Sequence, residues 1–279
     1  MSGEHSVPQR SPKSYIICTA PRSGSTMLCK LLAATKVAGN PGSLFHEPAL
    51  DAWLEYYGLE TADLASRRDA LEAVFSAAIA RGKGGGDIFG LRMQRGSFDF
   101  FMVQLGLRHP DLESDLGRIE AEFGPTLFIH LSRRDRLDQA ISRLRAEQTG
   151  LWHLKADGTD LERLTPERED GYDAEAIRTH IADLSQLDQA WERWFRQEAI
   201  EPLRVSYEAL ARNPHATLAE IVTALGLEAS LAAGVPPQTK KLADKTSRAW
   251  RARFEAETGQ AGAYARLSER RVSPRSRRA

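Results

Sequence analysis

Six consecutive residues near the start of the chain carry the side chains best suited to chemistry. They are Pro21, Arg22, Ser23, Gly24, Ser25 and Thr26. An arginine supplies a planar fork of permanent positive charge. A glycine lets backbone N–H groups approach a ligand with no Cβ in the way, and three hydroxyl groups stand beside it. This combination is typical of a cradle for a phosphate or sulfate group.

The residues on either side of this turn predict the elements that hold it. Residues 15–18 are apolar and include two β-branched side chains, which indicates a short buried strand. Residues 27–34 are mostly strong helix formers. A strand, turn and helix in this order direct backbone N–H groups and the positive end of the helix at one point, which favours an anion. The alternative is an ordinary turn whose helix is capped by a serine or threonine.

The same turn can also be compared with the phosphate loop of a P-loop kinase. That loop needs a Gly-Lys pair followed by Ser or Thr, and no such pair stands before residue 27. No aspartate suited to binding a magnesium ion ends a predicted core strand. These two absences weaken the interpretation of the chain as an ATP-dependent kinase.

Further cationic and hydroxyl side chains gather where predicted strands end. Arg92 lies just past one strand, Ser132 and Arg133 follow another, and Ser142 lies on the helix after them. A basic loop covers residues 240–248. Ligands of open α/β sheets bind at the carboxyl ends of the strands. The joint pattern predicts a ligand with two separated anionic groups.

The remaining patterns predict the framework. Strands are expected at residues 15–18, 88–91, 127–131 and 203–207. Helices are expected at residues 27–34, 70–81 and 174–198, and from Thr217 to Gly226. A further helix is expected after Arg136, with Leu137, Ile141 and Leu144 on one face. Thr217 and Glu220 form a capping-box pattern, and residues 151–169 predict an exposed, charged insertion. Strands alternating with helices predict an α/β fold with a largely parallel sheet covered on both faces.

Composition narrows the function classes further. The 38 basic residues equal the 38 acidic residues, so no global charge favours nucleic acid as a partner. No apolar run reaches the ~20 residues that span a bilayer, and no signal peptide is visible. Cys18 and Cys29 fall on a strand and a helix, which indicates small buried hydrophobes and not a disulfide or metal site. We expect a soluble cytoplasmic protein, with residues 1–13 disordered, a folded domain over 14–260 and a basic tail over 261–279.

Two of these motifs resemble sulfotransferases. The turn at residues 21–26 resembles their 5′-phosphosulfate loop, and residues 129–133 with 139–142 resemble their 3′-phosphate site. More closely, the chain resembles the bacterial trehalose 2-sulfotransferase family, which also contains proposed lipopolysaccharide sulfotransferases. Supporting segments are residues 37–41, 145–149 and 243–247, together with Trp152 and Trp250. The similarity extends over about residues 14–255.

The resemblance implies a single-domain, P-loop nucleotide-kinase-like, three-layer fold and the donor 3′-phosphoadenosine 5′-phosphosulfate, with no metal. It implies that the phosphosulfate is held by Arg22, Ser23, Gly24, Ser25 and Thr26, with Arg22 also acting in catalysis. It implies that Arg133 and Ser142 hold the 3′-phosphate. The loop that would close over the nucleotide contains Lys241, Lys245 and Ser247. Sulfuryl transfer is an in-line displacement, so fixed cations and N–H groups are the expected catalysts.

One position departs from the family. A glutamate shortly after the Gly-x-Pro element resembles the general base of the trehalose enzyme, but Ser43 stands at that position here. A serine is not a general base at neutral pH. His46 and Glu47 are the nearby candidates, and His46 is favoured because an ordinary imidazole titrates near neutral pH.

The acceptor is expected to be a carbohydrate hydroxyl, on trehalose, a glycolipid or a lipopolysaccharide. Candidates for its pocket are Trp53, Tyr56, Tyr57, Trp152 and His153. The departure at Ser43 keeps open a nucleotide- or anion-binding module without turnover. The family resemblance also suggests a homodimer.

Overall fold

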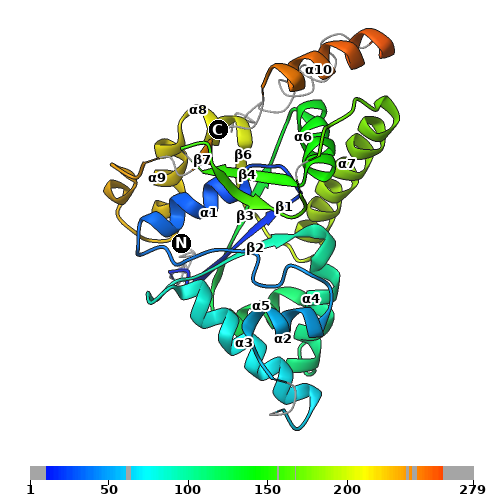
Figure 1. Ribbon diagram of the computed structural model, residues 1–279. Helices are drawn as coiled ribbons and strands as arrows, with labels where there is room; N and C mark the ends of the chain where they lie inside the picture. The colour runs from blue at the N-terminus through cyan, green and yellow to red at the C-terminus, as the bar shows by residue number, and fades with distance from the viewer. Residues whose placement is uncertain are drawn as a thin grey trace, which may run out of the picture.

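A parallel four-stranded sheet forms the centre of the computed structural model (Figure 1). The structure describes residues 11–60, 64–155, 157–166, 168–236, 239–240 and 244–259. The strands stand in the order β2-β1-β3-β6, with the bounds Ser14–Thr19 (β1), Phe89–Gln94 (β2), Thr126–Ser132 (β3) and Leu203–Ser206 (β6). Neighbouring strands all run in the same direction, which confirms the predicted parallel sheet.

Strand β1 lies at the centre of this sheet and is buried along its whole length. Because side chains alternate across a strand, Ile16 and Cys18 join one apolar cluster while Tyr15 and Ile17 join another. The sheet is therefore covered on both faces, and the expected three-layer α/β fold is confirmed.

Helices cover the two faces as distinct groups (Figure 1). One apolar cluster takes its helical residues from α2 (Leu50–Tyr57), α3 (Arg67–Lys83), α4 (Arg95–Arg108), α5 (Asp115–Phe123) and α7 (Ala174–Gln197). The other takes them from α1 (Ser25–Ala34), α8 (Tyr207–Arg212), α9 (Pro214–Ala224) and the short 3-10 helix Ala229–Ala232. A third cluster joins α6 (Arg136–Thr149) and α7 to α10 (Lys245–Thr258).

The charged segment at residues 151–169 is not a simple exposed insertion. It contains β4 (Leu151–Lys155) and β5 (Asp160–Arg163), which pair antiparallel, and β7 (Thr239–Lys240) pairs with β4 on its other side. The prediction failed because these short strands are half-buried and contain as many charged residues as an exposed loop does. In Figure 1 this small sheet lies beside β1 and α1.

Two other predictions are corrected at element boundaries. The helix expected to begin at Thr217 begins at Pro214 instead, because the Asn213 side chain accepts the Ala216 N–H at 3.1 Å and proline suits the first helical position. Arg92 lies inside β2 and not past its end. Helix α4 starts at the residue after β2, so no turn residues mark its beginning in the sequence.

The cysteines behave as the sequence indicated. Cys18 and Cys29 are both free and buried. No helix among the described residues is long and apolar enough to cross a membrane. The predicted terminal segments lie largely outside the described residues, although Lys13 already pairs its backbone N–H with the Pro125 carbonyl at 2.8 Å.

Candidate anion-binding site

The turn between β1 and α1, residues 20–24, has the backbone geometry that an anion cradle requires. Gly24 is the N-cap of α1 with φ +85°, and no side chain caps the helix. A Cβ on Gly24 would lie 2.5 Å from the Tyr207 ring, so only glycine fits. The alternative of an ordinary turn capped by a serine or threonine is therefore excluded. The first N–H groups of α1 are left without a side-chain acceptor, as anion sites at helix N-termini require.

Arg22 places a positive charge beside this turn with only neutral acceptors around it. Its Nε donates to the Ser142 hydroxyl at 3.0 Å, its Nη1 donates to the Trp152 carbonyl, and its guanidinium lies 5.8 Å from the Trp152 ring. The pKa of Arg22 is lowered to about 10, mainly by burial and also by the neighbouring Arg133, whereas Glu162 and Tyr207 act in the opposite direction. No ion pair to Arg22 is found within the described ranges. A partly buried cation without a carboxylate partner is suited to bind an anionic ligand.

Arg133 joins Arg22 at the same point. Its side chain is only 7% exposed and its guanidinium lies 4.6 Å from the Tyr207 ring. Its Nη1 donates to the Arg22 carbonyl at 3.4 Å, and its Nη2 lies 3.6 Å from an Asp138 carboxylate oxygen. Its buried Nε has no hydrogen-bond partner in the described part of the chain. The structure therefore brings together Arg22, Arg133 and Ser142, which the sequence assigned to two separate anion contacts.

A third arginine reaches the cradle from strand β2. Arg92 donates from Nε to the Ser43 hydroxyl at 2.9 Å and from Nη1 to the Thr26 hydroxyl at 2.7 Å. Thr26 Oγ1 also lies 2.9 Å from His153 Nε2 on β4. Ser43, Arg92, Thr26 and His153 thus form one continuous hydrogen-bonded chain. Two of these residues, Thr26 and His153, were predicted for the donor and acceptor sites.

The surroundings of His153 in this hydrogen-bonded chain keep its imidazole neutral. Burial lowers the pKa of His153 to about 3, with Arg22 and Arg92 adding to the effect. The Glu162 carboxylate on β5 lies 3.5 Å from His153 Nε2. A neutral imidazole accepts hydrogen bonds and protons, which an imidazolium cannot do.

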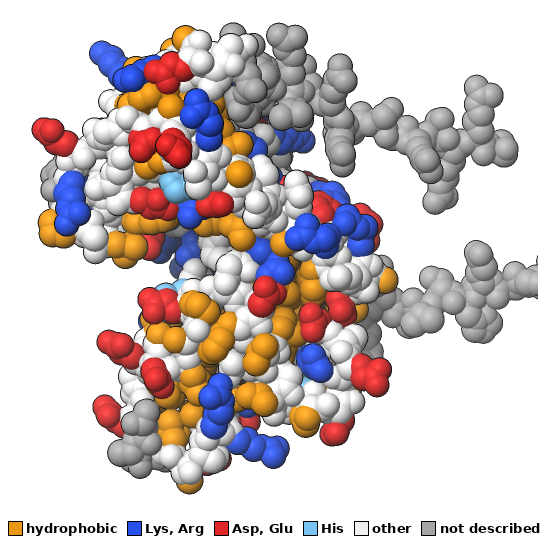
Figure 2. Space-filling model, turned by 90° about the vertical axis from the view of Figure 1, so that its right-hand side faces the viewer, with side chains coloured by type: hydrophobic (Ala, Val, Ile, Leu, Met, Phe, Trp, Pro, Cys, Tyr) orange, Lys and Arg blue, Asp and Glu red, His pale blue; other side chains and the backbone are white. Residues whose placement is uncertain are grey.

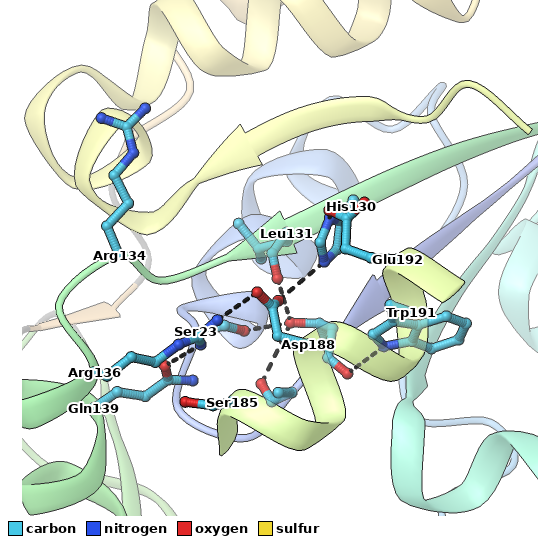
Figure 3. A network of polar contacts seen from close by, with 12 residues as sticks. Ser23, His130, Leu131, Arg134, Arg136, Gln139, Ser185, Asp188, Trp191 and Glu192 are labelled. Atoms are coloured by element: carbon cyan, nitrogen blue, oxygen red, sulfur yellow. Dashed lines mark hydrogen bonds and ion pairs between the residues drawn. The ribbon is translucent and has the colours of Figure 1, made fainter. Parts of the chain in front are cut away.

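A polar network behind the cradle fixes its shape (Figure 3). Thr19 accepts the Trp191 indole N–H on its carbonyl at 2.9 Å, and the Thr19 hydroxyl bonds to the Ser23 hydroxyl and to the Leu131 carbonyl. The amide of Gln139 donates to the Pro21 carbonyl at 2.7 Å. These bonds tie both ends of the turn to β3, α6 and α7.

The same network continues from the turn into α7. Arg136 donates to the Gln139 side-chain oxygen at 2.8 Å and pairs with Asp188. Asp188 in turn lies 3.1 Å from His130 Nε2 on β3. Trp191 is buried and part of this support.

We expect Gln139→Ala to weaken anion binding without unfolding the protein. The change leaves the Pro21 carbonyl unpaired and removes the bond that holds the turn, while alanine suits a helix. Affinity for adenosine 3′,5′-bisphosphate should fall ~10-fold in calorimetry, which corresponds to about 1.4 kcal/mol. Gln148→Ala on the same helix is the matched control, because the bonds of Gln148 in the described part of the chain go to Gly171 and not to the turn. Equal affinities of the two variants would remove Gln139 from the account.

The candidate bases named from the sequence lie on the loop after α1. His46 Nε2 lies 3.5 Å from a Glu47 carboxylate oxygen, and the His46 ring lies 5.1 Å from the Tyr56 ring. The His46 carbonyl accepts the Ser97 hydroxyl. These contacts do not join either side chain to the hydrogen-bonded chain at Thr26.

The aromatic candidates for the acceptor pocket divide into two groups. Trp53 is fully buried against Phe45, so the proposal that its ring binds a sugar is corrected: it is a core residue. Tyr57 is half-buried and donates to the Leu44 carbonyl at 2.8 Å, whereas Tyr56 is exposed. Trp152 and His153 are the candidates that contact the cradle.

The predicted closing loop is only partly described. Lys241 lies outside the described residues. Lys245 is the first residue of α10 and is exposed, while the Ser247 hydroxyl accepts a bond from Arg145 at 2.7 Å. Arg145 also pairs with Asp244, which caps α10. Ser247 is therefore held in a bond that fixes α10 against α6.

Sequence reasoning missed several residues that shape the site. Tyr207 packs against Gly24 and Arg133, and Glu162 faces His153. No local pattern identifies either, because each contact joins segments far apart in the chain. Among the described residues no group of three His, Cys, Asp or Glu side chains could hold a metal ion.

Figure 2 shows a hollow at mid-height, at the level of the central sheet, with Lys, Arg and His side chains inside it. A concave and basic surface of this kind suits an anionic small molecule.

Comparisons with known proteins agree with this chemistry. A model of the Stf0 sulphotransferase family matches residues 14–257. Trehalose 2-sulfotransferase of Mycobacterium tuberculosis is 27% identical over 275 residues, which cover 91% of this chain and 98% of that protein. Trehalose 2-sulfotransferase of Mycolicibacterium smegmatis is 28% identical over 271 residues, covering 90% and 97%. A solved sulfotransferase from Alicyclobacillus acidocaldarius aligns over 94% of this chain and 97% of that chain at 14% identity, with a TM-score of 0.43.

Proposed function

Because the chain belongs to the Stf0 sulphotransferase family, we propose that it transfers a sulfuryl group from 3′-phosphoadenosine 5′-phosphosulfate to a carbohydrate hydroxyl. The observation that carries the proposal is the cradle at β1 and α1, where Arg22 has only neutral partners among the described residues. The names of the relatives, both trehalose 2-sulfotransferases, support a carbohydrate as acceptor.

In this proposal the residues of the cradle divide between the two anionic ends of the donor. The N–H groups after Gly24 and the hydroxyls of Ser25 and Thr26 hold the 5′-phosphosulfate. The unpaired Nε of Arg133 and the Ser142 hydroxyl hold the 3′-phosphate. Arg22 links the two groups, because it belongs to the turn that ends at Gly24 and its side chain bonds to Ser142.

The chemistry that these residues supply is electrostatic. Displacement at sulfur places negative charge on the oxygen that leaves, and fixed cations stabilise that charge without reorganisation during the reaction. Arg22 and Arg92 are fixed in this sense, because each is held by hydrogen bonds to neutral groups. Holding donor and acceptor in line contributes the remaining acceleration.

A second candidate function is a binding module that holds the nucleotide without turnover. The observation in its favour is Ser43, which stands where the family glutamate is expected and accepts bonds from Arg92. This module and the enzyme share the donor site and differ only in whether a sulfuryl group moves.

The donor site is tested by calorimetry with the unmodified protein. We expect adenosine 3′,5′-bisphosphate to bind at least ~10-fold more tightly than adenosine 5′-monophosphate or ATP with magnesium, because the second anionic site is built for a 3′-phosphate. Tighter binding of ATP with magnesium would favour the kinase interpretation instead.

A further inference from the structure

Ser43 stands at the position where the family has a glutamate. The proposed reaction therefore has no general base at that position. Ser43 accepts two hydrogen bonds from the guanidinium of Arg92, at 2.9 Å from Nε and 2.5 Å from Nη2. A hydroxyl bound to a cation is a poor proton acceptor. If a sulfuryl group moves to a sugar hydroxyl, another group in the cradle has to take the proton.

His153 is the titratable side chain that reaches the cradle from the small sheet. Its Nε2 lies 2.9 Å from Thr26 Oγ1, at the start of α1. Thr26 Oγ1 already accepts the Arg92 N–H at 2.7 Å, so its own hydrogen is free to point at His153. This arrangement puts the acceptor lone pair of the imidazole on Nε2, directed at the turn.

We propose that His153 is the general base that removes the proton from the acceptor hydroxyl. This inference rests on the proposed sulfuryl transfer. When the donor is bound, the Thr26 hydroxyl turns toward the phosphosulfate, and the acceptor hydroxyl takes its place on Nε2. The acceptor oxygen forms a bond to sulfur, the bond from sulfur to the bridging oxygen breaks, the bisphosphate leaves with that electron pair, and the proton stays on the imidazole.

The charges around His153 fit this role. In the free protein Arg22 and Arg92 face the ring and, with burial, hold the pKa at about 3, so the lone pair is available. The bound donor brings negative charge to both arginines and thereby raises the proton affinity of the ring at the moment when a proton is released. Glu162, 3.5 Å from Nε2, stabilises the imidazolium that forms.

His46 is the competing candidate and has a different environment. It lies beside Glu47 and Tyr56 and is 35% exposed. An exposed side chain is not fixed relative to the reacting oxygen, and positioning is what general-base catalysis requires first.

The test compares His153→Gln, His46→Gln and His180→Gln with a labelled donor and an acceptor that the unmodified protein sulfates. His180 lies on α7 and pairs with Glu147, away from the cradle, so its variant is the matched control. We expect His153→Gln to lower kcat at least ~10²-fold, while its affinity for adenosine 3′,5′-bisphosphate changes less than ~3-fold. The acid limb of the pH profile of kcat should disappear in this variant, and Glu162→Gln should shift that limb.

Each other outcome overturns the inference in a recognisable way. A His153→Gln variant with unchanged kcat, or a ~10²-fold loss in His46→Gln alone, assigns the base elsewhere and leaves the proposed function intact. A His153→Gln variant that also loses bisphosphate binding makes His153 a binding residue. An unmodified protein that binds the bisphosphate but sulfates no acceptor contradicts the proposed function itself.

Discussion

Replacing Arg22 with alanine should abolish measurable binding of adenosine 3′,5′-bisphosphate and reduce sulfuryl transfer to background. Arg22 is the cation at the centre of the cradle, with bonds to Ser142 and Trp152 and none to a carboxylate among the described residues. Its full charge is therefore available to the ligand. Charge-assisted contacts to two phosphate groups make a loss of ~10³-fold or more, about 4 kcal/mol, the expected size in calorimetry.

The same substitution should not destabilise the free protein. Removing one member of an ion pair usually leaves a buried charge unpaired, but Arg22 leaves only a hydroxyl and a carbonyl behind. The melting temperature of Arg22→Ala is therefore expected to equal or exceed that of the unmodified protein. Arg253→Ala is the control, since Arg253 pairs with Glu257 on the exposed face of α10. An Arg22→Ala variant that binds the bisphosphate normally would remove the cradle from the donor site.

Replacing Arg133 with alanine should erase the preference for a nucleotide that carries a 3′-phosphate. The side chain is almost fully buried, and its Nε is an unsatisfied donor within the described structure. A buried guanidinium with an unused N–H is costly unless a ligand completes it. We expect the ratio of affinities for adenosine 3′,5′-bisphosphate and adenosine 5′-monophosphate to fall ~10²-fold, mainly because the bisphosphate binds more weakly.

The neighbouring residue provides a sharp control for that result. Arg134 follows Arg133 in the chain, but its side chain points away from the polar network in Figure 3. Arg134→Ala should keep the nucleotide preference of the unmodified protein. If Arg134→Ala lost the preference and Arg133→Ala kept it, the assignment of the 3′-phosphate contact would be wrong.

The cradle could be predicted because its parts are local in the sequence. A strand, a turn with Arg22 and Gly24, and a helix follow one another within about 20 residues, and the structure has them in that order. The parallel sheet could be predicted for a similar reason, because alternating strands and helices leave a repeated pattern.

The rest of the site could not be predicted, because its contacts join distant segments. Arg22 meets Trp152 across 130 positions and Ser142 across 120. The charged residues around His153 form strands over the cradle, which no local sequence pattern shows. One pairing partner of β4 is β7 at residues 239–240, far along the chain. Composition also could not distinguish Trp53, a core residue, from Trp152, a residue of the site.

The most direct test of the proposed function is a transfer experiment with labelled 3′-phosphoadenosine 5′-phosphosulfate. The unmodified protein is incubated with trehalose, lipid-linked sugars and lipopolysaccharide fragments, and the products are analysed by mass spectrometry. We predict that at least one carbohydrate gains a single labelled sulfate, and that the Arg22→Ala variant forms none. Tight binding of the bisphosphate with no labelled product from any acceptor would contradict the enzyme and support the binding module.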